Sequence, residues 1–152
     1  MKIKMVTINN RKKSFEIVTS KGQQYSFPFA LLDNPPTLEN KIIDYKIDKE
    51  TGRESIEYTL EDGGCDSIHS DYFLDYNKDY EYIEKKIIYN LTIDCQKAVA
   101  ESGLSKREIA RKLKTSFAQL LRLLDQTNYN KSVNSLIALL TVLGKKVDIL
   151  VA

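Results

Sequence analysis

The feature that most constrains the fold is residues 104–124, LSKREIARKLKTSFAQLLRLL, in which apolar residues recur at helical spacing. Ile109, Ala110 and Leu113 follow the i, i+1, i+4 spacing of a buried helix face, while the basic residues between them point mainly elsewhere. The small side chain of Ala110 leaves room for another helix to cross. These residues predict a first short helix that packs closely against a neighbour.

The second half of the same stretch predicts that neighbour. Ser116 is suited to be its N-cap, because a serine hydroxyl accepts a backbone N–H of the first helical turn. Leu120 and Leu123 would then pack against Ala110. We therefore expect a helix-turn-helix that presents the outer face of its second helix to a partner.

Charge divides unevenly along the chain, although the whole carries a formal net charge of only +2. Residues 1–91 hold 13 basic and 16 acidic side chains, a net of −3, whereas residues 92–152 hold 10 and 5, a net of +5. Such an excess is typical of a surface that faces phosphates, and equally of a solvated helix face. Nine consecutive positions of the helix-turn-helix stretch carry five of the cations: Lys106, Arg107, Arg111, Lys112 and Lys114.

The stretch also matches a known sequence pattern. Residues 104–113 read LSKREIARKL, residues 114–116 read KTS and residues 122–124 read RLL. They resemble the Xre/Cro/lambda-repressor class of helix-turn-helix domains, whose pattern is L-S-x-x-E-[IL]-A-x-x-[LMV]-G-[ITV]-S followed by R-[IL]-[LE]. Lys114 stands where that class has glycine, so we expect a non-glycine residue at positive φ, at a cost on the order of 1 kcal/mol.

The resemblance implies a DNA-binding transcriptional regulator, possibly antitoxin-like, with double-stranded DNA and a toxin-like protein as partners. Phosphate contacts would come from Lys106, Arg107, Arg111 and Lys114. Base edges would be read by Gln119 and Arg122, and thymine methyl groups would be touched by Phe117 and Ala118. Ser116, at the start of the recognition helix, completes the expected DNA-binding set.

An alternative follows from the same helix. Phe117, Leu121 and Leu124 follow i, i+4, i+7 spacing and form an apolar stripe, where the class usually has polar residues at its first positions. Exposed stripes of this kind usually mark a protein contact. The competing hypothesis is therefore a protein-interaction module with little or no sequence-specific DNA binding.

The N-terminal part is predicted to be rich in β-structure. Alternating apolar residues and turn residues indicate hairpins, with a possible helical turn near residues 71–74. Residues 27–76, with Gly63, Gly64, Asp66, Ile68 and Leu74, resemble small DUF2442-type domains. We therefore expect an α+β chain of two domains: residues 1–78, which are β-rich and DUF2442-like, and residues 79–152, which hold the helix-turn-helix. Residues 79–102 would form one helix, or two that abut near residues 90–92.

The last residues predict a further helix and a strand. A helix capped by Ser132 would end at Gly144, and Val147, Ile149 and Val151 then alternate as in a β-strand. In several Xre-class proteins such a strand pairs with its counterpart in a second subunit, which implies a homodimer with its recognition helices about 34 Å apart. Pairing with the N-terminal sheet is the other possibility for this strand.

Other chemistry has little support in the sequence. Cys65 and Cys95 lie 30 positions apart and form no CxxC motif, and His69 is the only histidine, so we expect no metal and no cofactor. No phosphate-binding glycine loop or hydrolase motif occurs, so we expect no enzyme. No apolar run is long enough to cross a bilayer, and the simplest expectation is a reduced, cytoplasmic protein.

Overall fold

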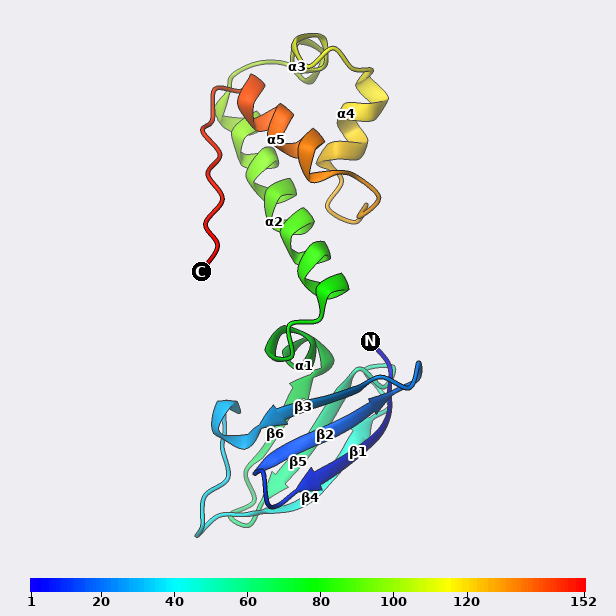
Figure 1. Cartoon of the computed structure of the whole chain (residues 1–152), viewed down its shortest axis with the longest axis vertical. Helices are drawn as coiled ribbons and strands as arrows, with labels where there is room; N and C mark the ends of the chain where they lie inside the picture. The colour runs from blue at the N-terminus through cyan, green and yellow to red at the C-terminus, as the bar shows by residue number, and fades with distance from the viewer. The chain divides into compact units, whose positions relative to one another are not determined.

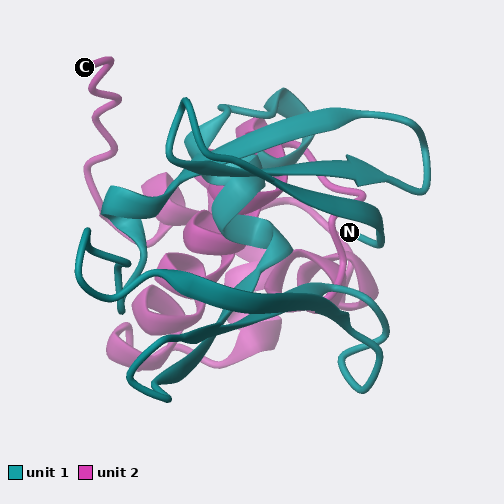
Figure 2. Ribbon diagram, turned by 90° about the horizontal axis from the view of Figure 1, so that it is seen from below, with its two compact units in different colours: residues 1–82 teal, residues 83–152 magenta.

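The computed structural model describes residues 1–152, which divide into two compact units, Met1–Tyr82 and Ile83–Ala152 (Figure 2). The sequence placed the division between residues 78 and 79. The boundary between the units falls inside a single helix, α2 (Tyr80–Glu101), so residues 79–102 do not form two abutting helices. None of the helices combines the length and apolar composition that a membrane span requires.

The N-terminal unit consists of two three-stranded antiparallel sheets (Figure 1). Each sheet is a meander, in the order β1-β2-β3 or β4-β5-β6. A short 3-10 helix, η1 (Phe29–Leu31), follows β3, and helix α1 (Ser70–Tyr76) follows β6. The strands are β1 (Ile3–Asn9), β2 (Ser14–Thr19), β3 (Gln24–Pro28), β4 (Ile42–Asp48), β5 (Ser55–Leu60) and β6 (Cys65–His69).

The two sheets are copies of one structural unit. In the first, Ile3 pairs with Thr19 and the ladder is irregular between Ile3 and Met5; in the second, Ile42 pairs with Leu60 and the irregularity lies between Ile42 and Asp44. The β2–β3 and β5–β6 ladders also have the same register at an offset of 41 residues. The central strands share one pattern of burial along their length. This repeat was not predicted from the sequence.

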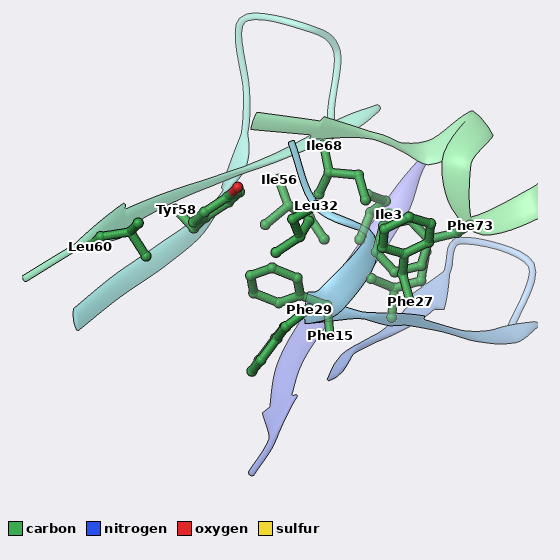
Figure 3. Packing of buried hydrophobic residues seen from close by; sticks show 11 residues of the cluster. Ile3, Phe15, Phe27, Phe29, Leu32, Ile56, Tyr58, Leu60, Ile68 and Phe73 are labelled. Carbon is green, nitrogen blue, oxygen red and sulfur yellow. The ribbon is translucent and has the colours of Figure 1, made fainter. Parts of the chain in front are cut away.

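Both sheets contribute to one apolar core. Figure 3 shows side chains from the two sheets pointing toward one another, with Phe15 near the middle. The Phe15 ring lies 5.1 Å from that of Phe29 and 5.7 Å from that of Tyr58, between ring centroids, which is the range of favourable aromatic pairs. A three-stranded sheet with one apolar face must cover that face, and here each sheet covers the other.

The C-terminal unit is helical. Its core is formed by α2, α3 (Lys106–Lys112), α4 (Phe117–Leu124) and α5 (Val133–Val142). The predicted ends of α5 are confirmed: Ser132 Oγ accepts the Ser135 N–H at 3.1 Å at its start, and Gly144 has positive φ just beyond its last residue. Gly103 has positive φ in the same way just beyond α2.

The predicted C-terminal strand does not form. Residues 145–152 have no regular structure; Val147 packs on the helical core, whereas Ile149 and Val151 are exposed. Alternation alone cannot make a strand, because the backbone N–H and C=O groups need a partner strand to pair with.

The predicted α+β class with a terminal strand is therefore wrong: the chain is mixed, with six strands in two sheets followed by five helices. A homodimer through this strand loses its structural basis.

Candidate nucleic-acid interface

Helix α3 begins with a capping box. The Glu108 backbone N–H donates to Ser105 Oγ at 3.2 Å, and the Ser105 N–H donates back to Glu108 Oε2 at 2.8 Å. The hydrogen bond from the Ser105 backbone holds the pKa of Glu108 below its usual value. The box fixes where α3 starts, and so it orients the exposed Lys106 and Arg107 of the first turn.

The turn between α3 and α4 is tight and left-handed at one residue. Lys114 has φ 56°, as the sequence predicted. Its N–H donates to the Arg111 carbonyl at 3.1 Å, and the Thr115 N–H donates to the Ala110 carbonyl at 3.0 Å, which is the Schellman pattern. Ser116 then caps α4 by accepting the Gln119 N–H at 3.1 Å. The predicted cap at Ser116 is confirmed.

Replacing Lys114 with glycine is expected to stabilise the C-terminal unit by about 0.5–1 kcal/mol, because glycine adopts positive φ without steric cost. Lys114→Ala is the matched control, since alanine loses the same charge but keeps the strain. Denaturant unfolding followed by circular dichroism measures the difference. Equal stability of the two variants would contradict the explanation.

Helix α4 is anchored at its middle and at its end. Leu120 is fully buried in the same core as Ile109 and Ala110, as predicted. At the C-terminus, Lys131 Nζ donates to the carbonyls of Leu123 at 2.8 Å and Asp125 at 2.7 Å. These bonds satisfy acceptors that the helix itself leaves open.

The side chains that form this C-terminal anchor, Lys131 and Gln96, were not predicted from the sequence. Burial lowers the pKa of the Lys131 ammonium, which is occupied by the α4 carbonyls and belongs to the scaffold. Gln96 Nε2 adds a third bond, to the Leu124 carbonyl at 2.7 Å. Gln96 lies 28 residues from the carbonyl that it binds, and Lys131 lies 8 and 6 residues from its two carbonyls, so no regular sequence spacing predicts these bonds.

The outward face of α4 is mostly apolar. Phe117 and Leu121 are 43% and 41% exposed, and Ala118 between them is exposed as well. Because successive residues turn about 100° around a helix, Arg122 lies beside Ala118 on this face, whereas Gln119 lies toward its edge. The predicted apolar stripe is shorter than expected, since Leu124 packs against the core.

One contact joins the two helices across this face. The Arg107 guanidinium carbon lies 5.9 Å from the centre of the Phe117 ring, within the range of a cation–π interaction. The first turn of α3 and the first turn of α4 are thereby linked on the solvent side.

All of the predicted DNA-binding side chains are exposed. They lie on α3, the turn and α4, so the structure brings them onto one helix pair. The salt bridges of this unit involve other residues, Lys145 with Glu101 and Lys146 with Asp148, which leaves the cations of the helix pair available to an anionic partner. The exposed residues are Lys106, Arg107, Arg111, Lys114, Ser116, Phe117, Ala118, Gln119 and Arg122.

Cys95 and His69, two side chains that can take part in chemistry, make structural contacts in this protein. Cys95 is buried, its thiol donates to the Leu136 carbonyl at 3.5 Å, and burial raises its pKa to about 11. His69 caps α1, with Nδ1 accepting the Asp71 N–H at 3.3 Å. No three His, Cys, Asp or Glu side chains are grouped so as to hold a metal ion.

Comparison of the chain with protein-family models, curated proteins and solved structures finds no match.

Proposed function

We propose that the C-terminal unit binds double-stranded DNA and that the protein is a transcriptional regulator of the helix-turn-helix class. One observation carries this proposal: the exposed cations of α3 and of the turn lie on the same helix pair as the exposed face of a capped, anchored helix, α4. Such a helix enters the major groove while the cations hold the phosphates on either side.

The helix pair supplies both kinds of contact that a regulator needs. Lys106, Arg107, Arg111 and Lys114 would hold phosphates, which fixes the position of the protein on the duplex. Arg122 and Gln119 are the polar side chains of α4 that would read base edges, with Arg122 suited to bidentate contact with guanine. Both cysteines are free thiols, which fits a reducing, cytoplasmic location.

Binding to duplex DNA tests the proposal. We expect the full chain to prefer a subset of genomic fragments, including its own promoter, in a fluorescence anisotropy titration. With four phosphate contacts the affinity should fall about 100-fold between roughly 50 and 200 mM salt. A flat salt dependence, or equal binding to all fragments at low salt, would contradict the proposal.

Arg122 offers a sharper version of this test. Arg122→Ala is expected to reduce the preference for the bound sequence about 10-fold or more. Arg122→Lys should keep the salt dependence but lose part of the preference, because an ammonium lacks the rigid planar fork of donors with which a guanidinium matches guanine O6 and N7. Lys21→Ala, which removes an exposed cation from the N-terminal unit, is the control and should leave the affinity unchanged.

The second candidate function is a protein-interaction module. The exposure of Phe117 and Leu121 favours it, since large apolar side chains in water often mark a protein contact. The inward packing of Leu124 weakens it, because the stripe is reduced to two large residues. A toxin-like protein is the partner that this function would need, and its capture by the full chain without DNA binding would favour the module.

A further inference from the structure

The N-terminal unit has an open apolar surface beside α1. Leu31, Tyr72 and Tyr76 each expose roughly half of their side-chain surface. The two tyrosine rings meet the buried ring of Phe27 edge-on, with centroids 6.1 and 5.6 Å from its centre. Phe27 itself lies against Phe73 in the core (Figure 3). The core below is therefore closed, and the outer sides of Leu31 and the two tyrosines face solvent.

Two carboxylates lie at this surface. A narrow crevice is lined by Leu31, Tyr72 and the exposed Asp33, and the buried Tyr58 lies beneath it. The Tyr58 hydroxyl donates to Asp66 Oδ2 at 3.4 Å. Burial and the charges of Asp66 and Asp33 raise the pKa of Tyr58 to about 12, so both carboxylates lie near one hydroxyl. The salt bridges of this unit involve other carboxylates.

The surrounding part of the unit is acidic as well. Residues 55–76, which form β5, β6, α1 and their connections, hold six acidic side chains and no lysine or arginine. Residues 33–82 hold 5 basic and 14 acidic side chains, a net of −9, whereas residues 1–32 hold 6 and 1, a net of +5. A partner for this surface must therefore be cationic and must also offer apolar groups.

The helix pair α3–α4 has the complementary composition. On α4, Phe117, Ala118 and Leu121 expose apolar groups. We infer that the acidic face, defined by Leu31, Asp33, Asp66, Tyr72 and Tyr76, binds the α3–α4 helix pair of a second copy of this chain. The exposed cations that would meet this face are Lys106, Arg107, Arg111, Lys112 and Lys114.

Both surfaces gain from this contact. Each brings apolar side chains that are exposed to water in the single chain, and each brings charges of the sign that the other lacks. Tyrosine rings also attract guanidinium groups, which suits Tyr72 and Tyr76 to an arginine of α3. The contact joins two different surfaces, so every copy can bind one neighbour through each of them, and the association grows as a chain or closes as a ring.

This contact would also regulate the protein, a consequence that rests on the proposed function. Phe117, Ala118 and the cations of α3 are the side chains that the proposed DNA contact uses. A helix pair that is bound to an acidic face cannot bind DNA at the same time. Self-association and DNA binding therefore exclude each other, and a rising protein concentration should weaken DNA binding by each copy.

Sedimentation equilibrium of the full chain without DNA tests the contact. Over roughly 1 μM to 1 mM protein, we expect the average mass to rise above that of one chain. Raising the salt concentration from about 0.1 to about 1 M shortens the screening length from about 10 to about 3 Å. Because the contact depends on several exposed charge pairs, the association should then weaken about 10-fold or more.

Two substitutions at exposed positions each block one surface. Leu31→Lys places a cation on the acidic face, and Ala118→Glu places an acid among the cations of the helix pair. Each should weaken self-association about 10-fold or more, because the new charge repels the surface that it meets. Leu38→Lys and Ala100→Glu make the same changes at exposed positions elsewhere and are the controls. Circular dichroism checks that all four variants are folded.

Mixing the two blocked variants gives the sharpest result. Leu31→Lys retains an intact helix pair, and Ala118→Glu retains an intact acidic face. An equimolar mixture should therefore form a complex of two chains and grow no further, although each variant alone remains a single chain. Duplex DNA that binds the helix pair should dissociate this complex.

Three results would overturn the inference: the mass of a single chain over the whole concentration range, self-association that either variant leaves intact, or a mixture that does not pair. Each is measured without DNA, so each would leave the proposed function standing. Pairing of the two variants in a protein that shows no sequence-preferring DNA binding would instead support the contact and refute the proposed function.

Discussion

Truncation of Phe15 to alanine is expected to lower the free energy of unfolding of the N-terminal unit by about 3–5 kcal/mol. The side chain is fully buried between the two sheets and packs against the rings of Phe29, Tyr45 and Tyr58. Alanine would leave a cavity that strands on both sides cannot close. Because domains are stable by about 5–15 kcal/mol in total, the loss is a large fraction of the stability of this unit.

The distribution of tyrosines makes this effect measurable unit by unit. Seven of the nine tyrosines lie in residues 1–82, so tyrosine fluorescence follows the N-terminal unit, whereas far-ultraviolet circular dichroism follows mainly the helices of residues 83–152. In Phe15→Ala we expect only the fluorescence transition to move and the proposed DNA binding to persist. Leu38→Ala, at a side chain that is 82% exposed, is the control. A shift of both transitions would show that the units depend on each other for stability.

Truncation of Leu120 to alanine is expected to destabilise the C-terminal unit by about 2–5 kcal/mol and to weaken the proposed DNA binding strongly. Leu120 has no exposed surface and packs in the core with Ile109, so its loss loosens α4 against α3. Helix α4 would then no longer be held at a fixed angle to the cations of α3. Circular dichroism and anisotropy titration on the same sample measure the two effects.

The next residue provides the matched control for Leu120. Leu121 has the same side chain but is exposed, so Leu121→Ala should change the stability by less than about 0.5 kcal/mol. A large loss of stability in Leu121→Ala, or none in Leu120→Ala, would mean that the faces of α4 have been assigned the wrong way round.

Local features of this chain could be read from its sequence. Ser116 and Ser132 were identified as caps because a cap binds a backbone N–H only three residues away. The left-handed turn at Lys114 was predicted from the family resemblance, because the helix-turn-helix class has glycine at this position. The capping box was missed, although Ser105 and Glu108 have the S-x-x-E spacing that indicates one.

Features that depend on contacts between distant parts of the chain could not be predicted from the sequence. Residues 145–152 alternate like a strand, yet alternation says nothing about whether a partner strand exists. The C-terminal anchor of α4 by Gln96 and Lys131 joins residues from different elements. The exposure of the α4 face also depends on how α3 and α5 pack. The sequence alone therefore could not decide between DNA binding and a protein-interaction module.

The repeat of the two sheets could not be predicted from the sequence for a different reason. The repeated segments, residues 14–29 and 55–70, share few side chains, since what the fold conserves is burial and backbone pairing. Glycine marks the same turn in both copies, with φ 83° at Gly22 and 85° at Gly63. The identical pairs are Ser14 and Ser55, Glu16 and Glu57, Gly22 and Gly63, and Ser26 and Ser67.

This repeat has a consequence for how the two halves of the N-terminal unit depend on each other. One three-stranded sheet alone would leave Phe15 and Phe27 in water, so neither sheet is expected to be stable without the other. At equivalent positions of the two central strands, Phe15 corresponds to Ile56 and Ile17 to Tyr58, so the two apolar faces differ in shape. A symmetric pair of either sheet would therefore bring together other side chains than those that form this core.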